Sequence, residues 1–231
     1  MTHILAIDTT LGACSAALIK EGTITSYKCE VRVRGHVERL LPMIDEICEE
    51  SGIKISDIEN IAVTVGPGTF AGVRIGLSAA KGMALALDIK VVPVTTLEAI
   101  ICQFVEEEKG FKGKVAVAID ARRGEIYFQI FDVDKGTFKA ISTAEAIPIS
   151  KIGERITSDL DLLIGSGAEF LSGLKILSSK KYNFPDALYI AQYAEKKLGF
   201  AVRSDDISPL YLRAPDAIKP APLNMIVSNE E

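Results

Sequence analysis

The chain has 231 residues, of which 48% are hydrophobic and 25% are charged, with 18 glycines, 9 prolines and a formal net charge of -5 at pH 7. These values are typical of one large folded domain or two smaller lobes, and they exclude the disordered, collagenous and disulfide-dense classes. The acidic balance also argues against a protein that binds nucleic acid by itself, because phosphate neutralisation needs an excess of lysine and arginine.

Residues 1–110 predict an antiparallel meander followed by alternating helices and strands. Short apolar strands are expected over 3–7 and 13–19, and a third over 23–34, where apolar and charged side chains alternate with the period of a strand. Apolar residues then recur at helical spacing over 37–48 until a Ser-Gly pair ends the run. The remaining expected elements are a strand over 61–65, a helix over 71–87, a strand over 90–94 and a helix over 95–108. Such alternation indicates the α/β class.

The second half of the chain repeats the opening of the first. LAID at 5–8 is matched by VAID at 117–120, and a glycine follows each copy four residues later. VGPG at 65–68 has a counterpart in IGSG at 164–167, and both follow an apolar strand. Two sequence matches in the same order and the same structural setting indicate duplicated lobes.

The repeat sets the expected domain organisation. We place an N-terminal lobe at 1–110 and a C-terminal lobe at 111–213. The second lobe is expected to include a helix over 186–198, which begins at a good N-cap after a proline and stops at a glycine. The Pro-rich segment over 214–231 predicts a loose tail.

The cysteines and apolar segments bear on the cellular environment. Four widely spaced cysteines without a CxxC pair lie in apolar stretches and are predicted to be core residues in a reducing compartment: Cys14, Cys29, Cys48 and Cys102. No charged leader or cleavage site precedes the first strand, and the most apolar helical segment, 71–87, contains Arg74 and Lys81. We therefore expect a cytoplasmic protein that does not enter a membrane.

Two hairpins that each carry an aspartate suggest a phosphate-binding fold. A hairpin turn can direct backbone N–H groups at a phosphate, the aspartate can hold a hydrated metal ion, and the glycine turn before 71–87 can present N–H groups to an anion. The alternatives are local: the aspartates are turn formers and the glycines allow a tight reversal. The candidate phosphate or nucleotide residues are Asp8, Thr9, Thr10, Gly66, Gly68, Asp120, Gly165 and Gly167.

Conventional catalytic sets are not visible in the sequence. There is no GxSxG elbow and no P-loop, and the histidines are His3 and His36 alone. Leu40 stands four residues after His36, where a helical metal pair needs its second ligand. The sequence therefore predicts no metal site.

Five segments, taken in order, resemble the bacterial TsaB family, also called YeaZ, across residues 3–213: ILAIDTTLGACSAAL, GHVERLLPMID, GPGTFAGVRIGLSAAKGMA, AIDARRGEIYF and PLYLR. The resemblance implies an α/β fold of the actin/Hsp70-like (ASKHA) class, with two duplicated lobes and mixed sheets flanked by helices. It also implies a role in forming N6-threonylcarbamoyladenosine (t6A) on the tRNA adenosine beside the anticodon.

The resemblance further implies a non-catalytic subunit that works with the catalytic paralogue TsaD and the ATPase TsaE and reaches tRNA through their complex. The catalytic paralogue carries an HxxxH metal motif where this chain has His36 and Leu40. We expect no cofactor beyond weak or partner-shared ATP or ADP. The alternatives are an autonomous actin-like ATPase or sugar kinase, or a glycoprotein metallopeptidase.

The helix over 71–87 carries small residues on several faces, which predicts that it is covered on more than one side. We expect this helix and the helix over 37–48 to form a homodimer that the paralogue replaces on the same surface. The alternative is burial against the lobe's own sheet. The expected interface residues are His36, Leu40, Ile44, Ile47, Val73, Arg74, Leu77, Ala80, Lys81 and Ala84.

Overall fold

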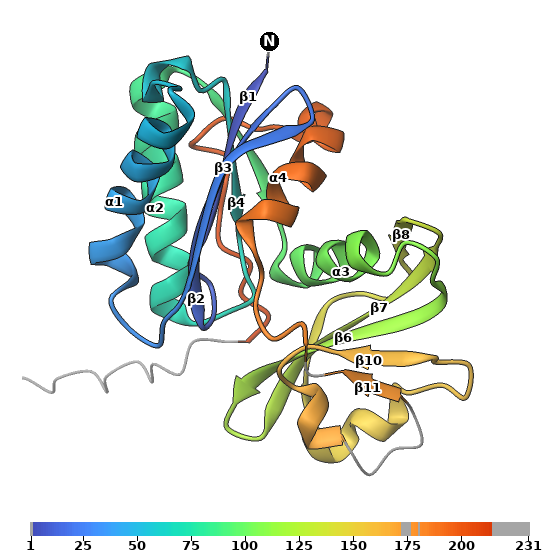
Figure 1. Cartoon of the computed structure of the whole chain (residues 1–231). Coiled ribbons are helices and arrows are strands. Elements are labelled where there is room, and N and C mark those ends of the chain that lie inside the picture. The colour runs from blue at the N-terminus through green and yellow to red at the C-terminus, as the bar shows by residue number, and fades with distance from the viewer. Residues whose placement is uncertain (1, 172–176, 180, 214–231) are drawn as a thin grey trace, which may run out of the picture.

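The computed structural model describes residues 2–171, 177–179 and 181–213, which form two lobes with one β-sheet each (Figure 1). The tail predicted over 214–231 lies outside the described residues. The strands of the first sheet are β1 (His3–Asp8), β2 (Ala13–Lys20), β3 (Thr23–Val31), β4 (Asn60–Thr64) and β5 (Lys90–Val94). Their order is β3-β2-β1-β4-β5. β2 is antiparallel to β1 and β3, while β1, β4 and β5 are parallel.

The second sheet repeats this arrangement. Its strands are β6 (Lys112–Arg122), β7 (Glu125–Asp134), β8 (Thr137–Ala140), β10 (Leu162–Ile164) and β11 (Leu177–Ser179), with β9 (Glu145–Pro148) added beside β7. The order β11-β10-β6-β7-β8 gives β6 an antiparallel neighbour on one side and a parallel neighbour on the other, as for β1. The matching topology confirms the predicted duplication and the actin/Hsp70-like class of α/β fold.

Four α-helices cover the two sheets: α1 (His36–Ser51), α2 (Phe70–Leu87), α3 (Thr96–Glu107) and α4 (Ala187–Lys196). α1 and α2 pack on one face of the first sheet, and α4 packs on the other (Figure 1). α3 follows the first sheet in the chain but packs its apolar side against β6 and β7 of the second. It therefore lies between the lobes.

Local sequence signals account for the helix ends. Thr69 caps α2 by accepting a hydrogen bond from the Gly72 N–H, and Thr95 and Glu98 form a capping box at the start of α3. Predicted and observed elements differ by a few residues. The helix predicted to end at residue 48 runs to Ser51, and the strand predicted to end at residue 34 ends at Val31. Val33 lies beyond the strand and is 91% exposed. The alternation of apolar and charged residues in the sequence therefore extends beyond Val31, the last residue of β3 that pairs with β2.

The position of α4 corrects the predicted lobe boundary. The sequence placed this helix in the second lobe, but Ile190, Ala191 and Ala194 are buried against β1, β2 and β5 of the first sheet. Its start is fixed there by two hydrogen bonds. The Ala187 N–H donates to Ser15 Oγ at 3.0 Å, and Tyr27 donates its hydroxyl proton to Asp186.

The segment after α4 stays with the first lobe. Val202 forms a β-bridge with Val91, and the Leu210 N–H donates to the Val65 carbonyl at 2.7 Å. α4 and the segment after it pack on the first lobe because β1 is buried on both faces. Its sheet therefore needs a cover on the face opposite α1 and α2. The first lobe is therefore completed by residues that follow the second lobe in sequence.

Candidate functional site

The hairpin that ends β1 holds its aspartate in a closed hydrogen-bond network. Asp8 is fully buried, and its Oδ1 accepts hydrogen bonds from Thr10 Oγ1 at 2.6 Å and from Thr64 Oγ1. Burial raises the pKa of Asp8 to about 6, although the two threonine hydroxyls lower it in part. Asp8 Oδ2 is buried without a hydrogen-bond partner among the described residues. The carboxylate thus serves the hairpin's own structure.

The glycine turn before α2 packs directly on this hairpin. The Thr69 N–H donates to the Thr10 carbonyl at 2.9 Å, and Thr9 Oγ1 donates to the Gly72 carbonyl at 2.6 Å. A Cβ at Gly68 would lie 2.6 Å from the Thr10 carbonyl oxygen. Both groups therefore donate to carbonyls of the protein itself. These contacts favour the alternative of a tight strand-to-helix turn over the predicted anion site. Gly66 in the same turn has a φ of 108°, which favours glycine.

The second hairpin neutralises its aspartate in another way. Asp120 Oδ1 accepts the Arg122 N–H at 2.8 Å, while its Oδ2 lies 3.2 Å from the Arg122 guanidinium. The Asp120 N–H donates to Ser166 Oγ. A Cβ at Gly165 would lie 2.2 Å from the Ala118 carbonyl oxygen and one at Gly167 would lie 3.1 Å from the Ala118 carbonyl carbon, and so the two glycines let the β10 turn approach β6. They match the role of Gly68 in the first lobe.

These contacts decide whether the described residues fit a nucleotide phosphate. The first hairpin uses both threonine hydroxyls in bonds within the protein, the Thr69 and Gly72 N–H groups at the start of α2 are also bonded within the protein, and the second hairpin pairs its carboxylate with an arginine. The described residues thus do not fit a phosphate group or a phosphate-bound metal. Among them, no group of three His, Cys, Asp or Glu side chains is placed to hold a metal ion.

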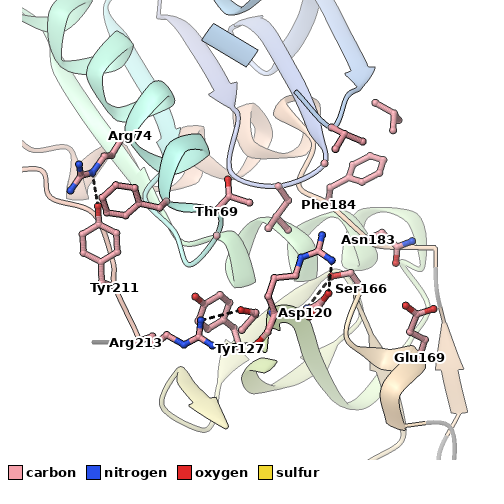
Figure 2. A pocket seen from close by; sticks show the side chains of 18 residues that line it. Thr69, Arg74, Asp120, Tyr127, Ser166, Glu169, Asn183, Phe184, Tyr211 and Arg213 are labelled. Atoms are coloured by element: carbon pink, nitrogen blue, oxygen red, sulfur yellow. Dashed lines mark hydrogen bonds and ion pairs between the residues drawn. The ribbon is translucent and has the colours of Figure 1, made fainter. Parts of the chain in front are cut away.

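A cavity of about 1040 Å³ lies between the two hairpins (Figure 2). Residues from both lobes form its walls, and most of the lining is apolar or aromatic. At one side the Arg74 guanidinium lies 3.7 Å from the centre of the Phe70 ring and donates from Nε to the Tyr211 hydroxyl at 3.1 Å. The Phe70 and Tyr211 rings stack with centroids 6.0 Å apart. Opposite them lie Asp120, Ser166, Glu169, Asn183 and Phe184.

Sequence reasoning missed this cavity and its aromatic residues. Tyr211 stands in the PLYLR segment and Phe70 in the glycine-rich segment, but nothing in their spacing brings them together. The Leu210-to-Val65 hydrogen bond does so, because it ties the last described segment to the turn before α2. The contact joins residues that are remote in sequence, so no local pattern could have indicated it.

The structure corrects most of the predicted interface on α1 and α2. Eight of the ten residues are buried in the first lobe's own core: His36, Leu40, Ile44, Ile47, Val73, Leu77, Ala80 and Ala84. Arg74 is exposed and Lys81 is partly exposed. Helical periodicity identified the apolar side of each helix, but that side faces the sheet. Among the described residues, one helix, α2, is long and apolar enough to span a bilayer, as judged by length and composition alone.

The exposed side of the same helices carries a different apolar set. Val37 and Leu41 of α1 are 62% and 53% exposed, and Phe70 of α2 is 61% exposed. A groove of about 440 Å³ runs between the helices, lined by Val37, Leu40, Leu41, Arg74, Ile75, Ser78 and Ala79. We call this groove and its exposed rim the α1–α2 face. Leu40 forms the buried floor of this face, while Leu41, Arg74 and Ser78 lie next in sequence to the buried residues Leu40, Val73 and Leu77.

Comparison with known proteins shows what the chain is similar to. Residues 28–198 match the family model described as TsaD, tRNA N6-adenosine threonylcarbamoyltransferase. The "tRNA threonylcarbamoyladenosine biosynthesis protein TsaB" of Escherichia coli is 34% identical, with 95% of this chain and 98% of that protein covered. The protein of the same name from Haemophilus influenzae is 33% identical, with 91% and 93% covered.

Solved structures agree with these relatives. YeaZ from Pseudomonas aeruginosa superposes with a TM-score of 0.80 at 32% identity, covering 92% of this chain and all of that one. Family match, identity and structural similarity extend over both lobes. The chain belongs to the TsaB (YeaZ) family.

Proposed function

We propose that this chain takes part in forming N6-threonylcarbamoyladenosine on tRNA. The observation that carries the proposal is the near full-length similarity to two proteins named for the biosynthesis of this nucleoside. The two matches cover 91% and 95% of this chain and therefore include both lobes. The chain would join the pathway as a two-lobed unit.

Within that pathway we propose a non-catalytic role. The buried Asp8 network, the Asp120–Arg122 pair and the Thr69 N–H bonded to the Thr10 carbonyl support it, since these groups are already used within the protein. An autonomous ATPase or sugar kinase would need such a cradle. The unpartnered Asp8 Oδ2 is the feature most favourable to that alternative, but it is shielded from solvent.

The α1–α2 face is the proposed docking surface for the catalytic paralogue TsaD. Exposed apolar residues on neighbouring helices, Val37, Leu41 and Phe70, together with Arg74, have the composition of a protein interface. The chain alone would pair two copies through the same face, because an isologous contact hides it when the partner is absent. TsaE and tRNA would join through the resulting complex.

Reconstitution tests this function. Purified TsaD, TsaE, tRNA and threonylcarbamoyl-adenylate are combined with or without the chain, and modified adenosine is measured by mass spectrometry of digested tRNA. We expect modification to require the chain, and the chain alone to release no phosphate from ATP. Equal modification without it would contradict the proposed role, and ATP turnover of about 1 per second by the isolated chain would contradict its non-catalytic character.

A further inference from the structure

The interlobe cavity and the α1–α2 face form one continuous surface. Arg74 lines both of them, and its stacking partner Phe70 lines the cavity and is itself exposed. Val31 and Val33, which also line the cavity, are 72% and 91% exposed. An apolar rim of this kind indicates a surface that a partner covers.

The chemistry of the cavity favours a protein segment as its occupant. Arg122 and Arg213 are paired with Asp120 and Glu125, whereas Arg74 has no carboxylate partner in the part of the chain that the structure describes. One unpaired arginine is too little positive charge for nucleic acid. Tyrosine and arginine beside other exposed aromatic residues are typical of the dominant contacts in protein interfaces.

The size and the hydrogen bonding of the cavity also favour a protein segment as its occupant. Its volume of about 1040 Å³ lies at the upper end of the roughly 300–1,000 Å³ of small-molecule pockets, which leaves room for several residues in an extended conformation. The phosphate-binding groups of the first hairpin are already used within the protein. A segment with one carboxylate and apolar side chains complements what remains.

We propose that the interlobe cavity receives an extended segment of the protein that docks on the α1–α2 face. The segment places a carboxylate on Arg74 and an aliphatic or aromatic side chain against Tyr211 (Figure 2) and against Phe70 and Leu11, which also line the cavity. This inference rests on the proposed docking of TsaD. It adds that the contact continues from one helix pair into the space between the lobes.

Filling the cavity tests the proposal. Gly12 lines the cavity, a Cβ there meets no atom within 4 Å, and its φ is not positive, so Gly12→Trp should fold and occupy the space. Gly199→Trp is the matched control, because Gly199 is equally open and lies outside the cavity lining. The dissociation constant of purified TsaD is measured for both variants. We expect Gly12→Trp to raise it at least about tenfold and Gly199→Trp to leave it unchanged.

A photo-crosslinking readout keeps the test decisive if Gly12→Trp does not fold. Benzoylphenylalanine is placed at Phe184 in the cavity wall, at Leu41 on the α1–α2 face, or at the exposed Phe200 outside both. Crosslinks from 184 and 41, but not 200, to two stretches of TsaD are expected, with Asp or Glu in the first stretch.

The outcomes separate this inference from the proposed function. Unchanged TsaD binding by folded Gly12→Trp, or a crosslink from position 41 without one from 184, would overturn the cavity proposal and leave the docking face standing. No TsaD binding by the wild-type chain would overturn the docking face, and the cavity proposal with it.

Discussion

At the scale of single residues, Asp8 shows how burial makes a carboxylate costly. Its folded-state pKa of about 6 lies above the ordinary value of 3.8, because desolvation outweighs the hydrogen bonds from Thr10 and Thr64. The folded protein therefore binds this proton more tightly than the unfolded chain does. The free energy of unfolding that Asp8 contributes is fully present below pH 4 and declines as the pH rises to 6.

Replacing Asp8 by Asn removes this titration. Asparagine keeps an oxygen to accept from the two threonines, and its amide nitrogen takes the place of the unpartnered Oδ2. Between pH 4 and pH 7 the wild type should lose about 2 kcal/mol relative to Asp8→Asn, from roughly 1.36 kcal/mol per pKa unit over the part of the titration that this range spans. Urea unfolding at both pH values measures the difference, and parallel pH profiles for the two proteins would rule the explanation out.

At the scale of elements, two glycines of α2 differ in the space available for a side chain. Gly72 packs against the Thr9 carbonyl with no space for a methyl group, whereas a Cβ at Gly82 meets nothing within 4 Å. Gly72→Ala should destabilise the protein by about 1–3 kcal/mol through overpacking. Gly82→Ala should stabilise it by up to about 1 kcal/mol through helix propensity. Chemical denaturation compares them, and similar effects from both would refute the packing argument.

Neighbouring leucines of α1 separate core from surface. Leu40 is 1% exposed and Leu41 is 53% exposed. Leu40→Asp should unfold the first lobe, since it buries an unpaired charge. Leu41→Asp should keep its thermal stability while it weakens self-association and TsaD binding at least about tenfold. Light scattering and circular dichroism measure these effects. An unfolded Leu41→Asp, or one that associates normally, would contradict the assigned face.

The elements themselves could be predicted better than the surfaces they form. Apolar periodicity and helix-end signals located the four α-helices of the described residues. The apolar and small residues of α1 and α2 marked the side that faces the sheet, so the sequence named Ala80 instead of Leu41 as interface. Periodicity measures apolar character and does not say what covers it. The repeated Asp-containing hairpins identified the fold class. The hydrogen bonds that close the first hairpin depend on Thr64 and Gly72, which are distant in sequence.

At the scale of the whole molecule, the two lobes are interleaved. α3 belongs to the first half of the chain and packs on the second sheet, while α4 comes from the second half and packs on the first. The two helices meet through polar contacts: Glu98 accepts from Lys197 at 2.7 Å and from the Tyr193 hydroxyl at 3.1 Å. The repeat in the sequence could not reveal this exchange, because it concerns strands and turns rather than the helices that cover them.

The exchange predicts that residues 1–110 do not fold alone. Without α4 the face of the first sheet that carries Ile4, Ala6 and Val92 meets water, and α3 exposes the apolar side that belongs on the second sheet. A chimeric chain that joins residues 1–94 to 181–213 through a Gly/Ser linker restores the missing cover and omits α3. We expect a cooperative thermal transition by circular dichroism for the chimera and none for 1–110. A cooperative transition in residues 1–110 would show that the first sheet is stable with one covered face, and the interleaving would then not determine how the lobe folds.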